Sequence, residues 1–206
     1  MQKKILFAVD GSDRCLDALA TVRELLKDQS GCDLELFHSV QEFSNSYTVE
    51  ADEIDAPRVF ASRVEKIGNS VLEKSKGVLL ASGFPAERTQ VKVELGSEDP
   101  AEDILRRAQA DGISTIALGR RGLSKIGRFV LGSVSNKIAH YCDRGAVWVV
   151  DTPVNQSRKV LLAVEGVQDC LVLARYAGAF FGSIPDLQFT LLHLIPPVPP
   201  AFWDDG

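Results

Sequence analysis

A glycine-rich basic segment between Ser114 and Val134 carries residue types that could bind a phosphate group. Its first part is a short apolar run, Ile116-Ala117-Leu118, which predicts a buried strand. Glycines stand at positions 119, 122, 127 and 132, and Ser133 follows at the expected start of a helix. Glycines let backbone N–H groups approach a phosphate closely, and the unpaired amides and dipole of a helix N-terminus favour negative charge. The segment therefore predicts a phosphate-binding loop.

Local charge supports this interpretation. Four basic residues lie in the segment without any acidic residue: Arg120, Arg121, Lys125 and Arg128. The whole chain has a formal net charge of -5, so this segment is positively charged within an acidic protein. Arg120 and Arg121 are candidates for phosphate contacts, and solvated loop charges are an equal alternative.

The composition narrows the class of protein. The chain has 206 residues, of which 45% are hydrophobic and 25% charged, as in an ordinary globular protein with a sizeable core. Its acidity argues against a general nucleic-acid binder. No apolar run approaches the ~20 residues that span a bilayer, and the N-terminus does not have the pattern of a signal peptide. We expect a cytoplasmic protein with neither nucleic acid nor membrane as a partner.

Cysteine and histidine spacing predicts no metal site and no catalytic triad. None of the four cysteines forms a C-x-x-C pair or stands at metal-ligand spacing from a histidine: Cys15, Cys32, Cys142 and Cys170. We expect free thiols, and we expect no catalytic residue from any of the three histidines.

The elements that must position the loop follow an alternating pattern. Apolar or alternating runs predict five strands, at 4–9, 34–40, 89–95, 113–118 and 146–150. Helical spacing predicts helices from Ser12 or Asp13 to a stop at Gly31, then at about 56–82, 97–110 and 132–141. Gly68 and Gly77 weaken the second of these helices.

This alternation predicts an α/β fold, an open five-stranded parallel sheet with helices on both faces. In such sheets the ligand binds beyond the carboxyl ends of the strands, where the strand order reverses. Asp10, Val40 and Gly119 stand at the ends of the first, second and fourth strands. They converge on one site if the first strand neighbours the fourth.

An internal repeat begins at Arg158. The sequence K-K-I-L-F-A-V-D-G, which begins at Lys3, recurs as R-K-V-L-L-A-V-E-G from Arg158, at a constant offset of 155. The repeat predicts two domains, 1–153 and 158–206, of which the second is a partial β-α-β copy with a second strand at 187–195. That copy has Glu165 in place of Asp10 and no counterpart of the glycine loop.

Two motifs resemble the universal stress protein (UspA-like) family. The nucleotide-binding members carry G-x-x-G, nine residues, then G-[ST], which matches 119–122 and Gly132-Ser133; A-V-D-G-S at 8–12 matches the first strand and turn. The resemblance covers about residues 1–152 and implies a Rossmann-like, adenine nucleotide alpha hydrolase-like fold. It also implies a tandem protein whose second copy is truncated.

The resemblance further implies a ligand and residue roles. The ligand would be ATP, with or without magnesium. Asp10 would lie beside the ribose, and Val40 would line the adenine pocket with backbone groups reading the base edge. The loop and helix N-terminus would surround the phosphates through Gly119, Gly122, Gly132, Ser133 and Val134, with Arg120 and Arg121 beside them.

Strand 146–150 commonly pairs across a two-fold axis in this family, so the resemblance also implies a homodimer through Ala146–Val150. Three functions then compete. The first is an ATP-binding regulatory protein of the stress response, the second a slow ATPase, and the third a nucleotide-free dimeric scaffold. A flavin- or adenylate-handling enzyme is a weaker alternative, because no further catalytic constellation is visible.

Overall fold

The computed structural model describes residues 3–27, 29, 31–40, 56–95, 99–120, 131–151 and 158–193. The chain divides into two compact units, Met1–Pro153 and Val154–Gly206, which are described separately. In the described residues, no helix combines the length and the apolar character that crossing a membrane requires.

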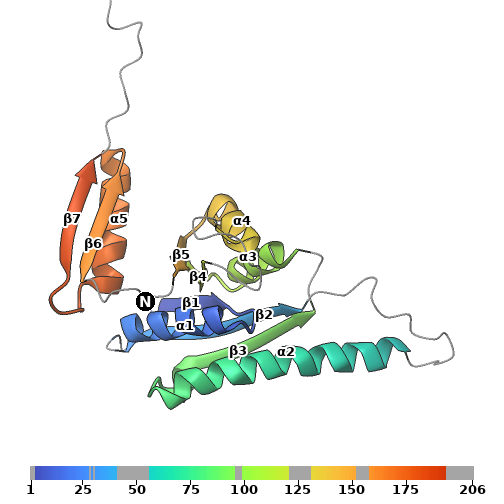
Figure 1. The fold of residues 1–206 in the computed structure, drawn as a ribbon. Coiled ribbons are helices and arrows are strands. Elements are labelled where there is room, and N and C mark those ends of the chain that lie inside the picture. Colours follow the sequence, from blue (N-terminus) through green and yellow to red (C-terminus); the bar gives the residue numbers. More distant parts are fainter. Residues whose placement is uncertain are drawn as a thin grey trace, which may run out of the picture. The chain divides into compact units, whose positions relative to one another are not determined.

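The first unit contains the predicted five-stranded parallel sheet (Figure 1). Its strands are β1 (Lys3–Ala8), β2 (Cys32–Val40), β3 (Thr89–Leu95), β4 (Thr115–Gly119) and β5 (Ala146–Val150), in the order β3-β2-β1-β4-β5. β1 therefore neighbours β4, which is the condition under which the three strand ends converge. β3 and β5 are the edge strands.

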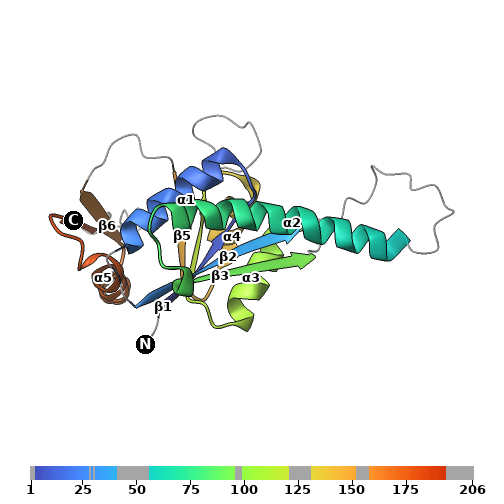
Figure 2. The ribbon, with the colours of Figure 1, turned by 90° about the horizontal axis from the view of Figure 1, so that it is seen from below.

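Helices cover both faces of this sheet (Figures 1 and 2). α1 (Asp13–Leu26) and α2 (Ala56–Ala81) lie on one face, and α3 (Pro100–Ala110) and α4 (Ser133–Tyr141) lie on the other. A short 3-10 turn, Ala86–Arg88, leads into β3. The fold class predicted from the sequence is confirmed.

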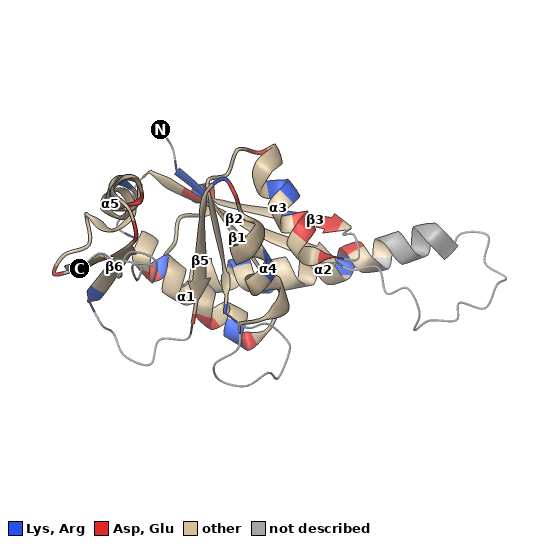
Figure 3. Cartoon of the chain, turned by 90° about the horizontal axis from the view of Figure 1, so that it is seen from above, with Lys and Arg blue, Asp and Glu red and all other residues tan. Residues whose placement is uncertain are grey.

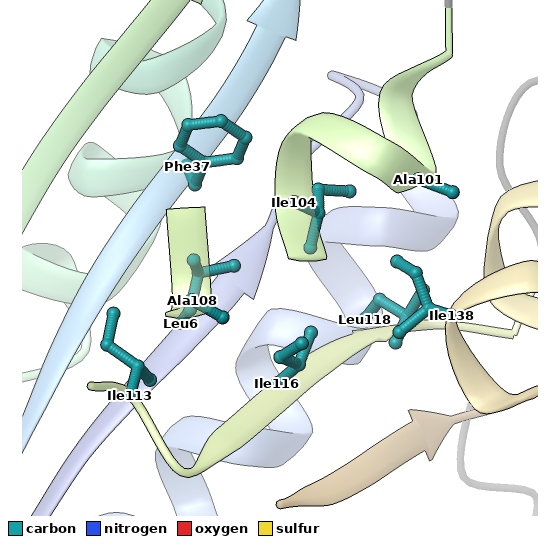
Figure 4. Close-up of a cluster of buried hydrophobic side chains, with 9 residues drawn as sticks. All are labelled: Leu6, Phe37, Ala101, Ile104, Ala108, Ile113, Ile116, Leu118 and Ile138. Carbon is teal, nitrogen blue, oxygen red and sulfur yellow. The ribbon is translucent and has the colours of Figure 1, made fainter. Parts of the chain in front are cut away.

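The core under α3 and α4 is a cluster of buried apolar side chains (Figure 4). It joins β1, β2, β4 and the loop before β4 to the two helices through Leu6, Phe37, Ala101, Ile104, Ala108, Ile113, Ile116, Leu118 and Ile138. Burying such side chains contributes about 1.5–3 kcal/mol for each large one. This cluster holds the two helices that frame the carboxyl edge of β4.

Two predicted helix bounds are wrong for local reasons. α3 begins at Pro100 rather than at 97, because the Asp99 side chain caps it by accepting a hydrogen bond from the Ala101 N–H at 3.0 Å. α1 ends at Leu26, several residues before Gly31.

Gly68 does not interrupt α2, which is continuous from Ala56 to Ala81. A Cβ atom at Gly68 would lie 2.7 Å from Val93 Cγ2 and 2.8 Å from Val40 Cγ2. The glycine is therefore the point at which α2 approaches the ends of β2 and β3 closely. At Gly77 a Cβ atom would meet nothing within 4 Å.

The described part of the second unit, residues 158–193, is one β-α-β segment: β6 (Lys159–Val164), α5 (Val167–Phe181) and β7 (Gln188–His193). Its strand register repeats that of β1 and β2 at the offset of 155: Ile5 pairs with Leu34, and Val160 pairs with Phe189. The predicted strand end at 194–195 lies outside the described residues.

Candidate functional site

The carboxyl edge of the sheet is stepped at β1. The β1–β2 ladder ends at the pair Ala8–Phe37, whereas β2 continues beside β3 for three more residues, to the pair Val40–Leu95. β4 also continues past its last pairing with β1, to Gly119 beside Val150. β1 thus ends before both of its neighbours, β2 and β4, and leaves a step in the carboxyl edge of the sheet. The strand order reverses at this point, and open α/β sheets bind their ligands at such points.

Asp10 lies at this step in a tightly bonded turn. Its Oδ1 accepts hydrogen bonds from the Ser12 N–H at 2.9 Å and the Ser12 hydroxyl at 2.7 Å. Gly11, with φ +79°, makes the turn, and the Ser12 hydroxyl caps α1 by accepting from the Cys15 N–H at 3.2 Å. The partly exposed Asp10 carboxylate is therefore held in one orientation beyond the end of β1.

The N-terminus of α4 faces the same edge. Gly132 is the N-cap, and no side chain from the described part of the chain caps the helix there. The Gly132 N–H donates to the Arg120 carbonyl at 2.9 Å, and the Ser135 hydroxyl donates to the Gly119 carbonyl at 2.8 Å. These bonds fix α4 to the end of β4. The first-turn amides of Ser133 and Val134 then lie at an uncapped, positively polarised helix end that suits an anion.

Arg120 is paired with an acidic residue beyond the end of β5. Its backbone N–H donates to the Val150 carbonyl at 2.7 Å, and its Nη1 lies 2.6 Å from Asp151 Oδ2. Both side chains are partly exposed, so this ion pair contributes little to stability. A contact between Arg120 and a phosphate stays a prediction. Arg121 and Gly122 lie outside the described residues.

Val40 reaches the site through its backbone. The residue is 7% exposed, and its side chain lies against Gly68 of α2, on the face away from α3. At the end of β2, any ligand contact therefore falls to the Val40 backbone rather than to its side chain.

The structure adds residues that the sequence analysis did not single out. Ser135 bonds the end of β4, and Ser39 at the end of β2 donates its hydroxyl to Asp103 Oδ2 at 2.6 Å. A serine in the first turn after the loop was the available signal for Ser135. Nothing in the sequence pairs Ser39 with Asp103, because 64 positions separate them.

The thiol nearest the site and the possible metal ligands are further groups of chemical interest among the described residues. Burial raises the pKa of the Cys15 thiol to about 12, so the thiol beside the Asp10 turn is protonated at neutral pH. No group of three histidine, cysteine, aspartate or glutamate side chains in the described ranges could hold a metal ion. A divalent ion would depend on oxygen atoms of the ligand.

Comparisons with known proteins agree with this fold. The model of the universal stress protein family matches residues 1–151. Universal stress protein YxiE from Bacillus subtilis (strain 168) is 32% identical over 143 residues, which cover 68% of this chain and 93% of that protein.

Two solved structures share the fold at low identity. Universal stress protein UspA from Lactobacillus plantarum matches with a TM-score of 0.54 and 18% identity, over 72% of this chain and 97% of that chain. A universal stress protein from Archaeoglobus fulgidus DSM 4304 matches with a TM-score of 0.61 and 17% identity, over 96% of this chain and 80% of that chain.

Proposed function

The chain belongs to the universal stress protein family, and from this premise we propose that its first unit binds an adenine nucleotide, with ATP as the ligand. One observation carries the proposal: the N-terminus of α4, which no side chain of the described ranges caps, lies at the step where β1 ends between β2 and β4. Backbone amides of a helix N-terminus bind phosphate without needing a basic side chain. The first turn of α4 contains no acidic residue that would repel it.

The proposed roles follow the positions of the described residues. Gly132, Ser133 and Val134 donate backbone amides to the phosphates, and the Asp10 carboxylate accepts hydrogen bonds from the ribose hydroxyls. The backbone at Val40 contacts the adenine edge. Magnesium, when present, is held by phosphate oxygens, which matches the absence of a three-ligand cluster among the described side chains.

In the proposed loop, Gly119, Gly122 and Arg121 complete the phosphate contacts. Gly119 ends β4, where the Ser135 hydroxyl bonds its carbonyl. We propose that a side chain at position 122 would obstruct the approach of a phosphate to the loop backbone.

We propose a regulatory role in the stress response for the bound nucleotide. In-line hydrolysis needs a positioned water and usually a base. At the step, Asp10 Oδ1 is bonded to the Ser12 turn, and the carboxylate is assigned to the ribose rather than to an attacking water. Any hydrolysis is then slow, and occupancy by ATP is the state that a partner senses.

Two further parts of the proposal concern assembly. β5 is an edge strand with partly exposed apolar side chains, Val149 being 36% exposed, so it is the proposed homodimer strand. The second unit is proposed to be a partial copy of the first. Besides the shared register, His38 and its repeat counterpart His193 each lie close to a backbone carbonyl just beyond the neighbouring strand. His38 Nδ1 is 2.6 Å from the Val9 carbonyl, and His193 Nε2 is 3.1 Å from the Glu165 carbonyl, one position past the counterpart of Val9.

Titration calorimetry tests the nucleotide proposal. Wild-type protein should bind ATP with magnesium, and Gly122→Val should bind it more weakly. Gly77→Ala, at an open position of α2, is the control and should bind like the wild type. Equal affinity of Gly122→Val and the wild type would contradict the phosphate-loop assignment.

A further inference from the structure

We propose that Ser39 and Asp103 are positioning residues that hold the base-contacting end of β2, an inference that rests on the proposed nucleotide site. The end of β2 needs such support because of the step in the sheet edge. Beyond Phe37, β2 has β3 on one side, up to the pair Val40–Leu95, and has left its ladder with β1 on the other.

The Asp103 carboxylate supplies this support from α3. Asp103 is 0% exposed and lies in the first turn of α3. Oδ2 accepts from the Ser39 hydroxyl at 2.6 Å, and Oδ1 accepts from Arg106 Nη2 at 2.8 Å. A buried carboxylate is costly unless it is bonded in this way. The short hydroxyl–carboxylate bond fixes Ser39, and with it the backbone of its neighbour Val40.

Arg106 extends the contact to the edge strand. Its Nη2 lies 3.6 Å from Glu94 Oε2 on β3, so the guanidinium spans the Asp103 and Glu94 carboxylates. Acidic and basic residues accordingly meet on α3 and at the adjoining end of β3 (Figure 3). The end of β2 is thus held through β3 on one side and through α3 above it.

α3 also reaches the phosphate end of the site. Asp99, which caps α3, is paired with Lys137 of α4, and the hydrogen bond from Lys137 lowers the pKa of the Asp99 carboxyl. Between these polar contacts, Ala101 and Ile104 pack beside Phe37, Leu118 and Ile138 (Figure 4). α3 therefore fixes the spacing between the end of β2 and the N-terminal end of α4. Loss of the Ser39–Asp103 bond should release only the β2 end.

The same strand and helix offer a matched control. Glu35, 1% exposed, lies toward the opposite end of β2 and accepts two bonds from Arg107 of α3, at 2.8 and 3.1 Å. Lys4 Nζ lies 2.7 Å from its Oε2. Glu35→Gln weakens the attachment of α3 to the sheet away from the proposed site. It should lower the melting temperature without changing nucleotide affinity.

The test measures displacement of a fluorescent ATP analogue by two competitors, ATP and inorganic tripolyphosphate, on the full-length chain. Ser39→Ala and Asp103→Ala should each lower the affinity for ATP by about 3- to 10-fold, the range expected for one lost hydrogen bond. Their affinity for tripolyphosphate should stay that of the wild type, because the α4 end is unchanged. Ser39→Thr keeps the hydroxyl and should bind ATP like the wild type.

The outcomes separate this inference from the function on which it rests. If the wild type binds neither the analogue nor ATP, the proposed function is wrong, and the inference is wrong with it. If the wild type binds ATP and both alanine variants bind it equally well, only the positioning role is wrong. An equal loss for ATP and tripolyphosphate, or a loss of ATP affinity in Glu35→Gln, would show a general structural role and also overturn the inference.

Discussion

Two alanine substitutions on α2 should change stability in opposite directions. At Gly68 a Cβ atom would lie 2.7 Å from Val93 Cγ2 and 2.8 Å from Val40 Cγ2, so two packed valines must move. Overpacking of this kind costs about 2–3 kcal/mol, and alanine regains about 1 kcal/mol of helix propensity. Gly68→Ala should therefore lower the free energy of unfolding by about 1–2 kcal/mol. Gly77→Ala meets nothing within 4 Å and should raise it by about 1 kcal/mol.

Urea unfolding followed by circular dichroism measures the free energy of unfolding of both variants. In thermal unfolding, each kcal/mol should shift the melting temperature by about 2–4 °C for a chain of this size. Gly68→Ala should also weaken ATP binding, because the displaced Val40 lies at the end of β2. If Gly68→Ala is as stable as Gly77→Ala, α2 is not in close contact with the sheet at this position.

Three further predictions address the site and its surroundings. Asp10→Ala should weaken adenosine and ATP binding by a similar factor in titration calorimetry, because the carboxylate is assigned to the ribose; an effect on ATP alone would assign it to a metal ion instead. Glu35 should make the protein sensitive to acid. Burial alone would raise its pKa, but hydrogen bonds from Arg107 and Lys4 outweigh burial and lower it. A lowered folded-state pKa gives stability that is present above the unfolded value of about 4.3 and is lost as the pH falls through the folded value. The wild type should therefore lose more stability than Glu35→Gln between neutral pH and strong acid, and parallel curves would contradict the ionic role. Cys15 should resist iodoacetamide at pH 8 in the folded protein, because burial raises its pKa to about 12; rapid alkylation seen by mass spectrometry would show that the Asp10 turn opens.

Most of the fold could be predicted from the sequence because periodicity is a local property. β3 and β5 have the predicted bounds, and the remaining strands differ by a few residues at their ends. The position of β1 beside β4 depends on tertiary packing, and the sequence pattern leaves it open. By helix propensity alone, Gly68 predicts a weakness in the helix, because local propensity contains no information about Val40 and Val93.

The strand-end residues of the candidate site could also be placed from the sequence. Carboxyl ends of parallel strands share an edge, so Asp10 and Gly119 follow from the strand order. The partners that fix them do not follow. Ser135 bonds the Gly119 carbonyl across 16 positions, and Arg120 pairs with Asp151 across 31. Such pairs depend on the distances at which separate elements pack.

The most direct test of nucleotide binding uses freshly purified protein. The protein is denatured, the supernatant is recovered, and any released nucleotide is identified by chromatography and mass spectrometry. We expect ATP to be released in an amount comparable to that of the protein. If the nucleotide is first removed exhaustively, the protein should bind ATP again on incubation with ATP and magnesium. Protein that neither releases a nucleotide nor takes up added ATP would show that the first unit does not bind ATP.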